Sequence, residues 1–212
     1  MFIYYLVALA SVGMFVIAAE VLANLNPHLS REITRKIAHI GIACAVAVWP
    51  FYLDWLAIQL LGLAITIGVL VAIRFELTPS IHRIARKNYG EALFGVMVIT
   101  AGMFSQTPAI FCATLLFLGL ADGLAAVTGL IWGRSSMYRV MGETRSLVGT
   151  GTFFTAALMI LAGYGLATGQ AIASFALIGI PLVTTVLENI SIRGTDNITV
   201  PLFVLMALNI LI

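Results

Sequence analysis

Three carboxylates lie where apolar segments of the chain begin or end. Asp122 lies inside an apolar run, Glu188 ends a later one, and Asp196 comes just before the last. An acid in the hydrocarbon of a membrane costs about 2.5–3.5 kcal/mol on insertion scales, so Asp122 is expected to have a function and a partner. Carboxylate oxygens together with phosphate are the usual ligands of Mg²⁺ in phosphoryl-transfer sites. The three acids are therefore predicted to hold Mg²⁺.

Arginines and glycines surround these acids in the sequence. The arginines are Arg134, Arg139, Arg145 and Arg193. A guanidinium group can pair with phosphate oxygens bidentately. Gly149 and Gly151 open an apolar run, and backbone N–H groups at such a helix N-terminus bind anions. No GxxxxGK followed by Ser or Thr occurs, so the chain has no P-loop. The combination indicates a site for a magnesium-bound nucleotide.

A purely structural interpretation is open for several of these residues. Small residues recur every four positions, at Ala121, Ala125, Gly129 and Gly133. This spacing is equally typical of a face that lets membrane helices pack closely. Glu188 and Arg193 could be solvated loop charges, and Asp196 with Asn197 could cap the last helix.

His39 follows Arg35 and Lys36 in the segment RKIAH, at the start of an apolar run. A lone histidine in such a place is more often an interfacial hydrogen-bonding group than a catalyst. It can also serve as a general base near neutral pH. Both interpretations stay open from the sequence.

The composition places the chain in a membrane. Of its 212 residues, 61% are hydrophobic and 9% are charged, and the mean hydropathy is +1.09, which leaves too little polar surface for a water-soluble protein. We predict one integral membrane domain over residues 1–212, an all-α bundle of about eight transmembrane helices. The predicted spans are 2–23, 37–50, 55–73, 90–105, 107–131, 148–166, 170–188 and 198–212.

The charges place the chemistry on one side of that membrane. All eleven Lys and Arg lie in alternate loops. The positive-inside rule predicts that these loops are cytoplasmic and that both termini lie on the non-cytoplasmic side. A transporter needs polar groups at the midplane and an exit on the far side. A lipid-scaffolding protein would bind no nucleotide. One-sided chemistry favours a multi-pass enzyme whose active site faces the cytoplasm and whose substrate has its own apolar tail. No nucleic-acid partner is expected.

Five separated motifs resemble the polyprenol kinase family, which includes dolichol, phytol and farnesol kinases and the CTP-dependent diacylglycerol kinase of yeast. They are RKxxH, YGE before a helix, ADGLAAVTGLIWG, ETRSLVGT, and a glutamate followed by GTDNITVP, and they span Arg35 to Pro201. The resemblance implies a membrane-embedded kinase that uses CTP with Mg²⁺ to phosphorylate an isoprenoid alcohol or diacylglycerol. The CTP:phosphatidate cytidylyltransferases, which make a CDP-lipid, have related segments, but their signature with paired aspartates and HGG is absent here.

The same resemblance assigns roles to residues. The family's nucleotide-binding segments fall on Asp122, Gly129, Gly133, Arg145, Ser146 and Gly149. Three residues depart from the family's pattern: Leu130 replaces an arginine, Arg145 a lysine and Val148 a glutamate. The resulting hypothesis has Asp122, Asp196 and Glu188 as metal ligands and catalytic groups, with His39 as a candidate base. The nucleotide would be bound by Gly129, Gly133, Arg134, Arg145, Ser146, Gly149, Lys36 and Asn197.

Overall fold

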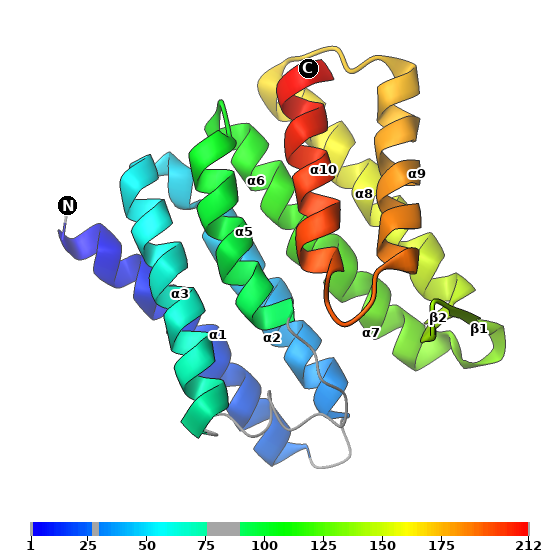
Figure 1. Cartoon of the computed structure of the whole chain (residues 1–212), viewed down its shortest axis with the longest axis horizontal. Coiled ribbons are helices and arrows are strands. Elements are labelled where there is room, and N and C mark those ends of the chain that lie inside the picture. Colours follow the sequence, from blue (N-terminus) through cyan, green and yellow to red (C-terminus); the bar gives the residue numbers. More distant parts are fainter. Residues whose placement is uncertain (1, 27–29, 76–89, 212) are drawn as a thin grey trace.

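The protein is a bundle of helices with one small hairpin, as the computed structural model shows (Figure 1). It describes residues 2–26, 30–75 and 90–211, so Tyr89 and the basic run 83–87 lie outside the described residues. The helices are α1 (Phe2–Leu25), α2 (Arg31–Ala47), α3 (Trp55–Phe75), α5 (Gly90–Phe104), α6 (Pro108–Leu116), α7 (Asp122–Trp132), α8 (Leu147–Thr168), α9 (Ser174–Ile190) and α10 (Asp196–Leu211).

The helical bundle expected from the sequence is confirmed, with differences at its boundaries. Each predicted span overlaps a helix, and the span 107–131 corresponds to α6, a π-helical turn (Phe117–Ala121) and α7. Helix α2 begins at Arg31, earlier than the predicted residue 37, because Ser30 Oγ accepts a hydrogen bond from Ile33 N–H at 3.2 Å and caps it. The first turns of α2 are polar, so an apolar run could not indicate that the helix begins there.

Four helices among the described residues are long and apolar enough to cross a membrane: Ile3–Leu25, Trp55–Phe75, Pro108–Trp132 and Leu147–Thr168. They make the chain an integral membrane protein. The count of eight spans and the sides of the two termini stay predictions.

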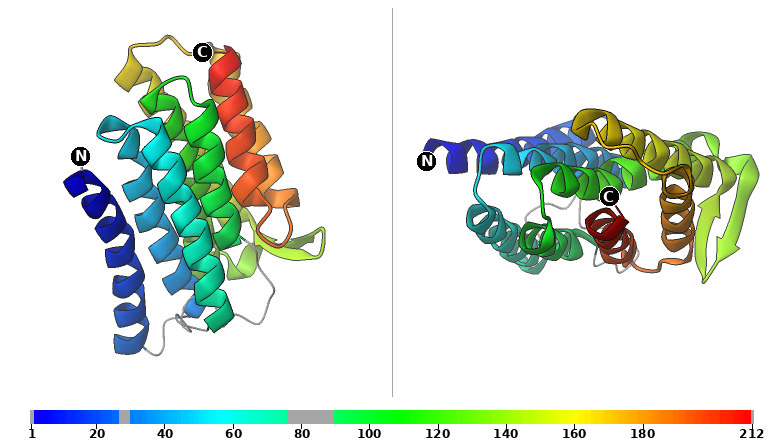
Figure 2. Two further views of the ribbon diagram at one scale, coloured as in Figure 1. Left: turned by 60° about the vertical axis from the view of Figure 1, so that its left-hand side comes forward. Right: turned by 90° about the horizontal axis from the view of Figure 1, so that it is seen from above.

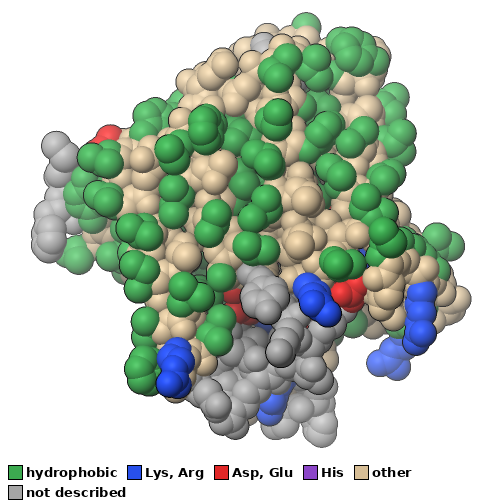
Figure 3. Space-filling model, viewed as in Figure 1, with side chains coloured by type: hydrophobic (Ala, Val, Ile, Leu, Met, Phe, Trp, Pro, Cys, Tyr) green, Lys and Arg blue, Asp and Glu red, His purple; other side chains and the backbone are tan. Residues whose placement is uncertain are grey.

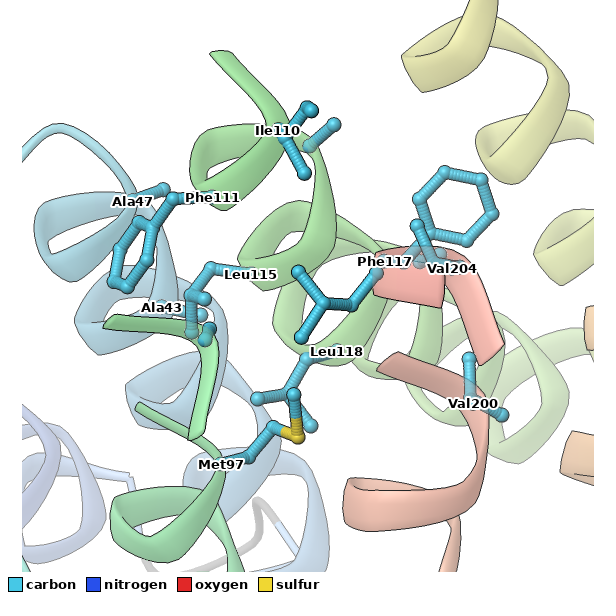
Figure 4. Packing of buried hydrophobic residues seen from close by; sticks show 14 of the residues in the cluster. Ala43, Ala47, Met97, Ile110, Phe111, Leu115, Phe117, Leu118, Val200 and Val204 are labelled. Atoms are coloured by element: carbon cyan, nitrogen blue, oxygen red, sulfur yellow. The ribbon is translucent and has the colours of Figure 1, made fainter. Parts of the chain in front are cut away.

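The helices form two layers, which are visible when the bundle is seen from above (Figure 2). One layer runs from α1 through α2 and the α6–α7 helix to α8, and the other runs from α3 through α5 and α10 to α9. The segment Pro108–Trp132 is the centre of the bundle, because 67% of an apolar window of 18 residues within it is buried, against 11% for the corresponding window of α1. Figure 4 shows its side chains meeting those of α2, α5 and α10.

Two glycines bring α2 close to the central helix. A Cβ added at Gly119 would overlap the Cβ of Ala43, and one added at Gly123 would overlap Ile40. Small residues at helix interfaces permit such close approach in membranes. The contact places the polar first turns of α2 beside Asp122.

A two-stranded hairpin joins α7 to α8, whereas the sequence predicts an all-α fold with a loop at this place. Strand β1 (Met137–Val140) pairs antiparallel with β2 (Glu143–Ser146). The two turn residues, Met141 and Gly142, have φ of 51° and 83°, as a type I′ turn requires. Strands of four residues are too short to show a reliable alternating pattern, so the sequence did not reveal them.

Charged side chains gather at one end of the bundle. Helices α2, α5 and α10 begin at that end, and α3, α7 and α9 end there (Figure 1). On the face shown in Figure 3, most Lys, Arg, Asp and Glu side chains lie toward this end, and hydrophobic side chains cover most of the rest. The C-terminus lies at the opposite end (Figure 1).

Candidate functional site

A cavity of about 380 Å³ opens at the charged end, between α2, α7, α8, α9, α10 and the hairpin. Its volume is in the range of small-molecule sites. Of the twelve residues to which the sequence-based hypothesis assigns a catalytic, metal-binding or nucleotide-binding role, ten line it, and Gly133 and Arg134 do not. Those that line it are Lys36, His39, Asp122, Gly129, Arg145, Ser146, Gly149, Glu188, Asp196 and Asn197.

The three predicted acids meet in this cavity. Asp122, Glu188 and Asp196 come from α7, α9 and α10, and their ligand oxygens lie within 4.8 Å of one another. Burial raises the pKa of the Asp196 carboxyl, and the negative charge of Asp122 raises it further. Carboxylate oxygens are hard donors, and Mg²⁺ prefers such donors together with phosphate and water, so the type of these three side chains fits this ion.

Lys36 is the partner of Asp122. Its Nζ lies 2.5 Å from Asp122 Oδ2, and the two side chains are only 11% and 7% exposed. Asp122 comes directly after the π-helical turn, a feature frequent at functional sites. A buried acid is thereby paired with a cation that the sequence places 86 residues away.

His39 lies on the same face of α2 and closes one side of the cavity. Its Nε2 is 3.3 Å from the carbonyl oxygen of Leu118 and 3.8 Å from Asp122 Oδ2. Both neighbours are acceptors, so we assign the hydrogen to Nε2 and the lone pair to Nδ1. In this tautomer Nδ1 can accept a proton.

Arg145 joins the hairpin to the end of α9. Its Nη1 donates to Glu188 Oε1 at 2.5 Å, and its Nη2 donates to the carbonyl oxygens of Glu188 and Ser191 at 2.8 and 3.1 Å. These bonds orient Glu188 toward the other two acids. Tyr138 holds the hairpin from the other strand, because its hydroxyl bonds to Thr150 Oγ1 and to Asn189 Oδ1.

The predicted glycines serve close packing between α7 and α8. A Cβ at Gly149 would lie 2.9 Å from the carbonyl oxygen of Ala125, and one at Gly133 would overlap Ser146. Ser146 caps α8, since its Oγ accepts from Gly149 N–H at 3.1 Å. Gly129 and Gly149 also line the cavity, whereas Gly133 does not. Gly133 therefore fits the small-residue interpretation alone, and Gly129 fits both interpretations. Gly149, which was predicted only to bind the nucleotide, also packs closely against α7.

The structure separates the remaining candidates. Arg134 and Arg139 are exposed and do not line the cavity, whereas Arg193 does. Asn197 Nδ2 donates to the carbonyl oxygen of Gly90 at 2.6 Å and so ties α10 to α5. Asp196 Oδ1 accepts from the N–H of the adjacent Asn197, whereas a capping side chain accepts from an N–H two or three residues further on. The Asp196 carboxyl belongs to the acid cluster.

Two further residues of α2 belong to the cavity and were not predicted from the sequence. Glu32 and Arg35 line the cavity with Lys36 and His39, and Arg35 Nη2 lies 2.6 Å from Glu32 Oε1. Residues three, four and seven positions apart share one face of a helix, so the spacing of these four residues in the sequence is a signal that could have predicted them together.

Comparison with known proteins supports the resemblance drawn from the motifs. No protein-family model matches the chain, and no solved structure matches it. Among curated proteins, a phytol kinase from Synechocystis sp. is 32% identical over 197 residues, which cover 90% of this chain and 83% of the relative. The chain is thus an integral membrane protein that belongs to the polyprenol kinase family, a family of lipid-alcohol kinases.

Proposed function

We propose that this protein transfers the γ-phosphate of magnesium-bound CTP to the hydroxyl of a lipid alcohol, either an isoprenoid alcohol such as phytol, farnesol or a polyprenol, or diacylglycerol. The observation that carries the proposal is the cluster of Asp122, Glu188 and Asp196 beside Lys36 and Arg145 in one cavity. The similarity to a phytol kinase supports an isoprenoid alcohol as the acceptor.

The charges of the cavity suit a nucleotide triphosphate. Asp122, Glu188 and Asp196 would hold Mg²⁺, which would neutralise negative charge on the phosphate oxygens. Lys36 and Arg193 line the same cavity and can bind phosphate oxygens directly. Arg145 keeps Glu188 in place and adds a positive charge. Catalysis would rest on alignment and charge stabilisation, as in other phosphoryl transfers.

The reaction also needs a proton acceptor. The alcohol oxygen forms a bond to the γ-phosphorus, the bond from that phosphorus to its bridging oxygen breaks, and CDP leaves. The hydroxyl proton goes to Nδ1 of His39 or to one of the three acids. His39 is well placed because its other nitrogen is held by Leu118, which fixes the ring.

The cavity is proposed to face the cytoplasm, where nucleotides are available. The supporting observation is that basic residues gather at the same end of the helices as the cavity.

Purified protein in liposomes containing phytol, incubated with Mg²⁺ and γ-labelled CTP, tests the proposal. We expect labelled phytyl phosphate and an equal amount of CDP, with ATP and UTP run in parallel to define the donor. Release of pyrophosphate with formation of a CDP-lipid would instead identify a cytidylyltransferase. Absence of any labelled lipid across a panel of alcohols would contradict the kinase assignment.

A further inference from the structure

A second cavity, of about 370 Å³, lies between the two helical layers on the other side of α2. We call it the α1–α3 groove, and its walls come from α1, α2, α3 and α5. Its apolar lining includes Leu9, Val16, Ile42, Ile65, Val69 and Phe94. Helix α1 packs on α2 and α3 packs on α5, while α1 and α3 do not pack along each other, which leaves the groove between them.

The groove and the acid-lined cavity share a wall. Arg35 and His39 line both cavities. The His39 ring contacts the Phe94 ring edge-on inside the groove, with centroids 5.3 Å apart, while its Nε2 points to Leu118 and Asp122. One imidazole therefore faces the apolar groove and the acid cluster at the same time.

The groove is polar at one end only. Arg35, His39 and Glu91 lie at the charged end, and the rest of the lining is apolar or small. On α3 the lining runs from Ala72 to Ala64, a length of about 12 Å at the helical rise of 1.5 Å per residue. The shape and polarity match an amphiphile with one small polar group at the end of an apolar chain.

Two glycines keep the groove open. Gly13 of α1 and Gly68 of α3 line it, and a Cβ added at either would meet no atom of the described residues within 4 Å. At Gly119 and Gly123, by contrast, atoms of α2 occupy the space that a Cβ would need. Gly13 and Gly68 thus leave open space in the groove, whereas Gly119 and Gly123 allow two helices to pack closely.

We propose that the α1–α3 groove binds the isoprenoid chain of the alcohol and delivers its hydroxyl to His39; this rests on the proposed function. Lipid tails are as apolar as the groove, so the chain gains little hydrophobic free energy by leaving the bilayer. What the groove supplies is orientation, because it holds the hydroxyl at the wall shared with the phosphate site. It selects substrates by the shape of the chain.

Filling the groove tests this proposal. Gly13→Phe and Gly68→Phe place a ring in the open space without a clash against the described residues. Gly163→Phe is the matched control, because Gly163 of α8 also faces open space but does not line the groove. We expect the ratio of kcat/KM for phytol to kcat/KM for a single-unit prenyl alcohol to fall about tenfold or more in both groove variants. The control is expected to keep the wild-type ratio.

A second measurement needs no catalysis. A prenyl alcohol bearing a photoreactive diazirine is cross-linked to the full-length protein in liposomes, and the labelled peptides are mapped. Labelling is expected in α1 and α3, reduced in Gly13→Phe and Gly68→Phe, and competed by phytol more strongly than by phosphatidylglycerol.

The two proposals fail in different ways. If the wild-type protein phosphorylates no alcohol, the proposed function is wrong, and the cross-linking map still tests the groove. If it phosphorylates phytol but both groove variants keep the wild-type ratio, the groove assignment is wrong. If phosphatidylglycerol competes with the labelling as strongly as phytol does, the groove is a site for membrane lipid, and the groove assignment is again wrong.

Discussion

Lys36 Nζ lies 2.5 Å from Asp122 Oδ2, across the interface between α2 and the central helix. This pair explains how an acid is tolerated inside an apolar segment. The ammonium group of Lys36 compensates the Asp122 carboxylate for the hydration that it loses on burial. One oxygen of Asp122 remains for other ligands. The pair also links the cavity to α2, whose His39 forms the wall toward the α1–α3 groove.

Asp122→Asn is expected to lower phytol phosphorylation at least about 100-fold, because the amide cannot neutralise Mg²⁺ or Lys36. Mg²⁺ with CTP should raise the thermal unfolding temperature of the wild type but not of the variant. Asp54→Asn is the control, since Asp54 caps α3 by accepting from Ala57 N–H at 2.8 Å and asparagine caps equally well. Full activity of Asp122→Asn would remove this acid from the mechanism.

Lys36→Met is expected to destabilise the protein by about 3–5 kcal/mol, because it leaves the buried Asp122 carboxylate without its partner. The double variant Lys36→Met/Asp122→Asn removes both charges and should recover much of that stability while staying inactive. Thermal unfolding in detergent of the wild type, both single variants and the double variant measures this coupling. Additive losses would show that the pair contributes nothing.

Gly119→Ala is expected to destabilise the protein by about 1–3 kcal/mol and to reduce activity, because its methyl group would overlap the Cβ of Ala43. The added volume pushes α2, with Lys36, away from Asp122. Combining it with Ala43→Gly exchanges the two residues across the interface and should restore both stability and activity. If the exchange restores neither, the helices do not meet at this contact.

Arg145→Ala is expected to raise the KM for CTP about tenfold or more, because a hydrogen bond to a charged group contributes about 1.5–3 kcal/mol. Arg145→Lys keeps the charge but cannot reach Glu188 and both carbonyl oxygens together, so its KM should be intermediate. Arg139→Ala is the control, because Arg139 lies on the same hairpin but is exposed and outside the cavity. A defect confined to the KM for the alcohol would contradict this assignment.

Local sequence was informative about class and about candidates. Long apolar runs with few charges identified a membrane bundle, since hydropathy over about twenty residues reflects the thickness of the bilayer. Asp122 was recognisable because a lone acid in such a run is rare. Glu188 and Asp196 were recognisable as acids at the ends of neighbouring runs, and the structure brings all three together.

Other features depended on contacts that no local pattern encodes. Arg134 and Arg145 look alike in the sequence, yet only Arg145 turns into the cavity, because the hairpin directs it toward Glu188. The hairpin itself is too short for a periodic signal.

The amino-acid sequence alone determined that the chain lies in a membrane, that its polar chemistry gathers toward one side, and which residues could perform it. The tertiary structure decided that Lys36 neutralises Asp122, that glycines at 119 and 123 bring α2 close enough to do so, and that an apolar groove opens beside His39. The physical reason is that hydropathy and charge act along the chain, whereas helices in a membrane associate through the packing of side chains distant in sequence.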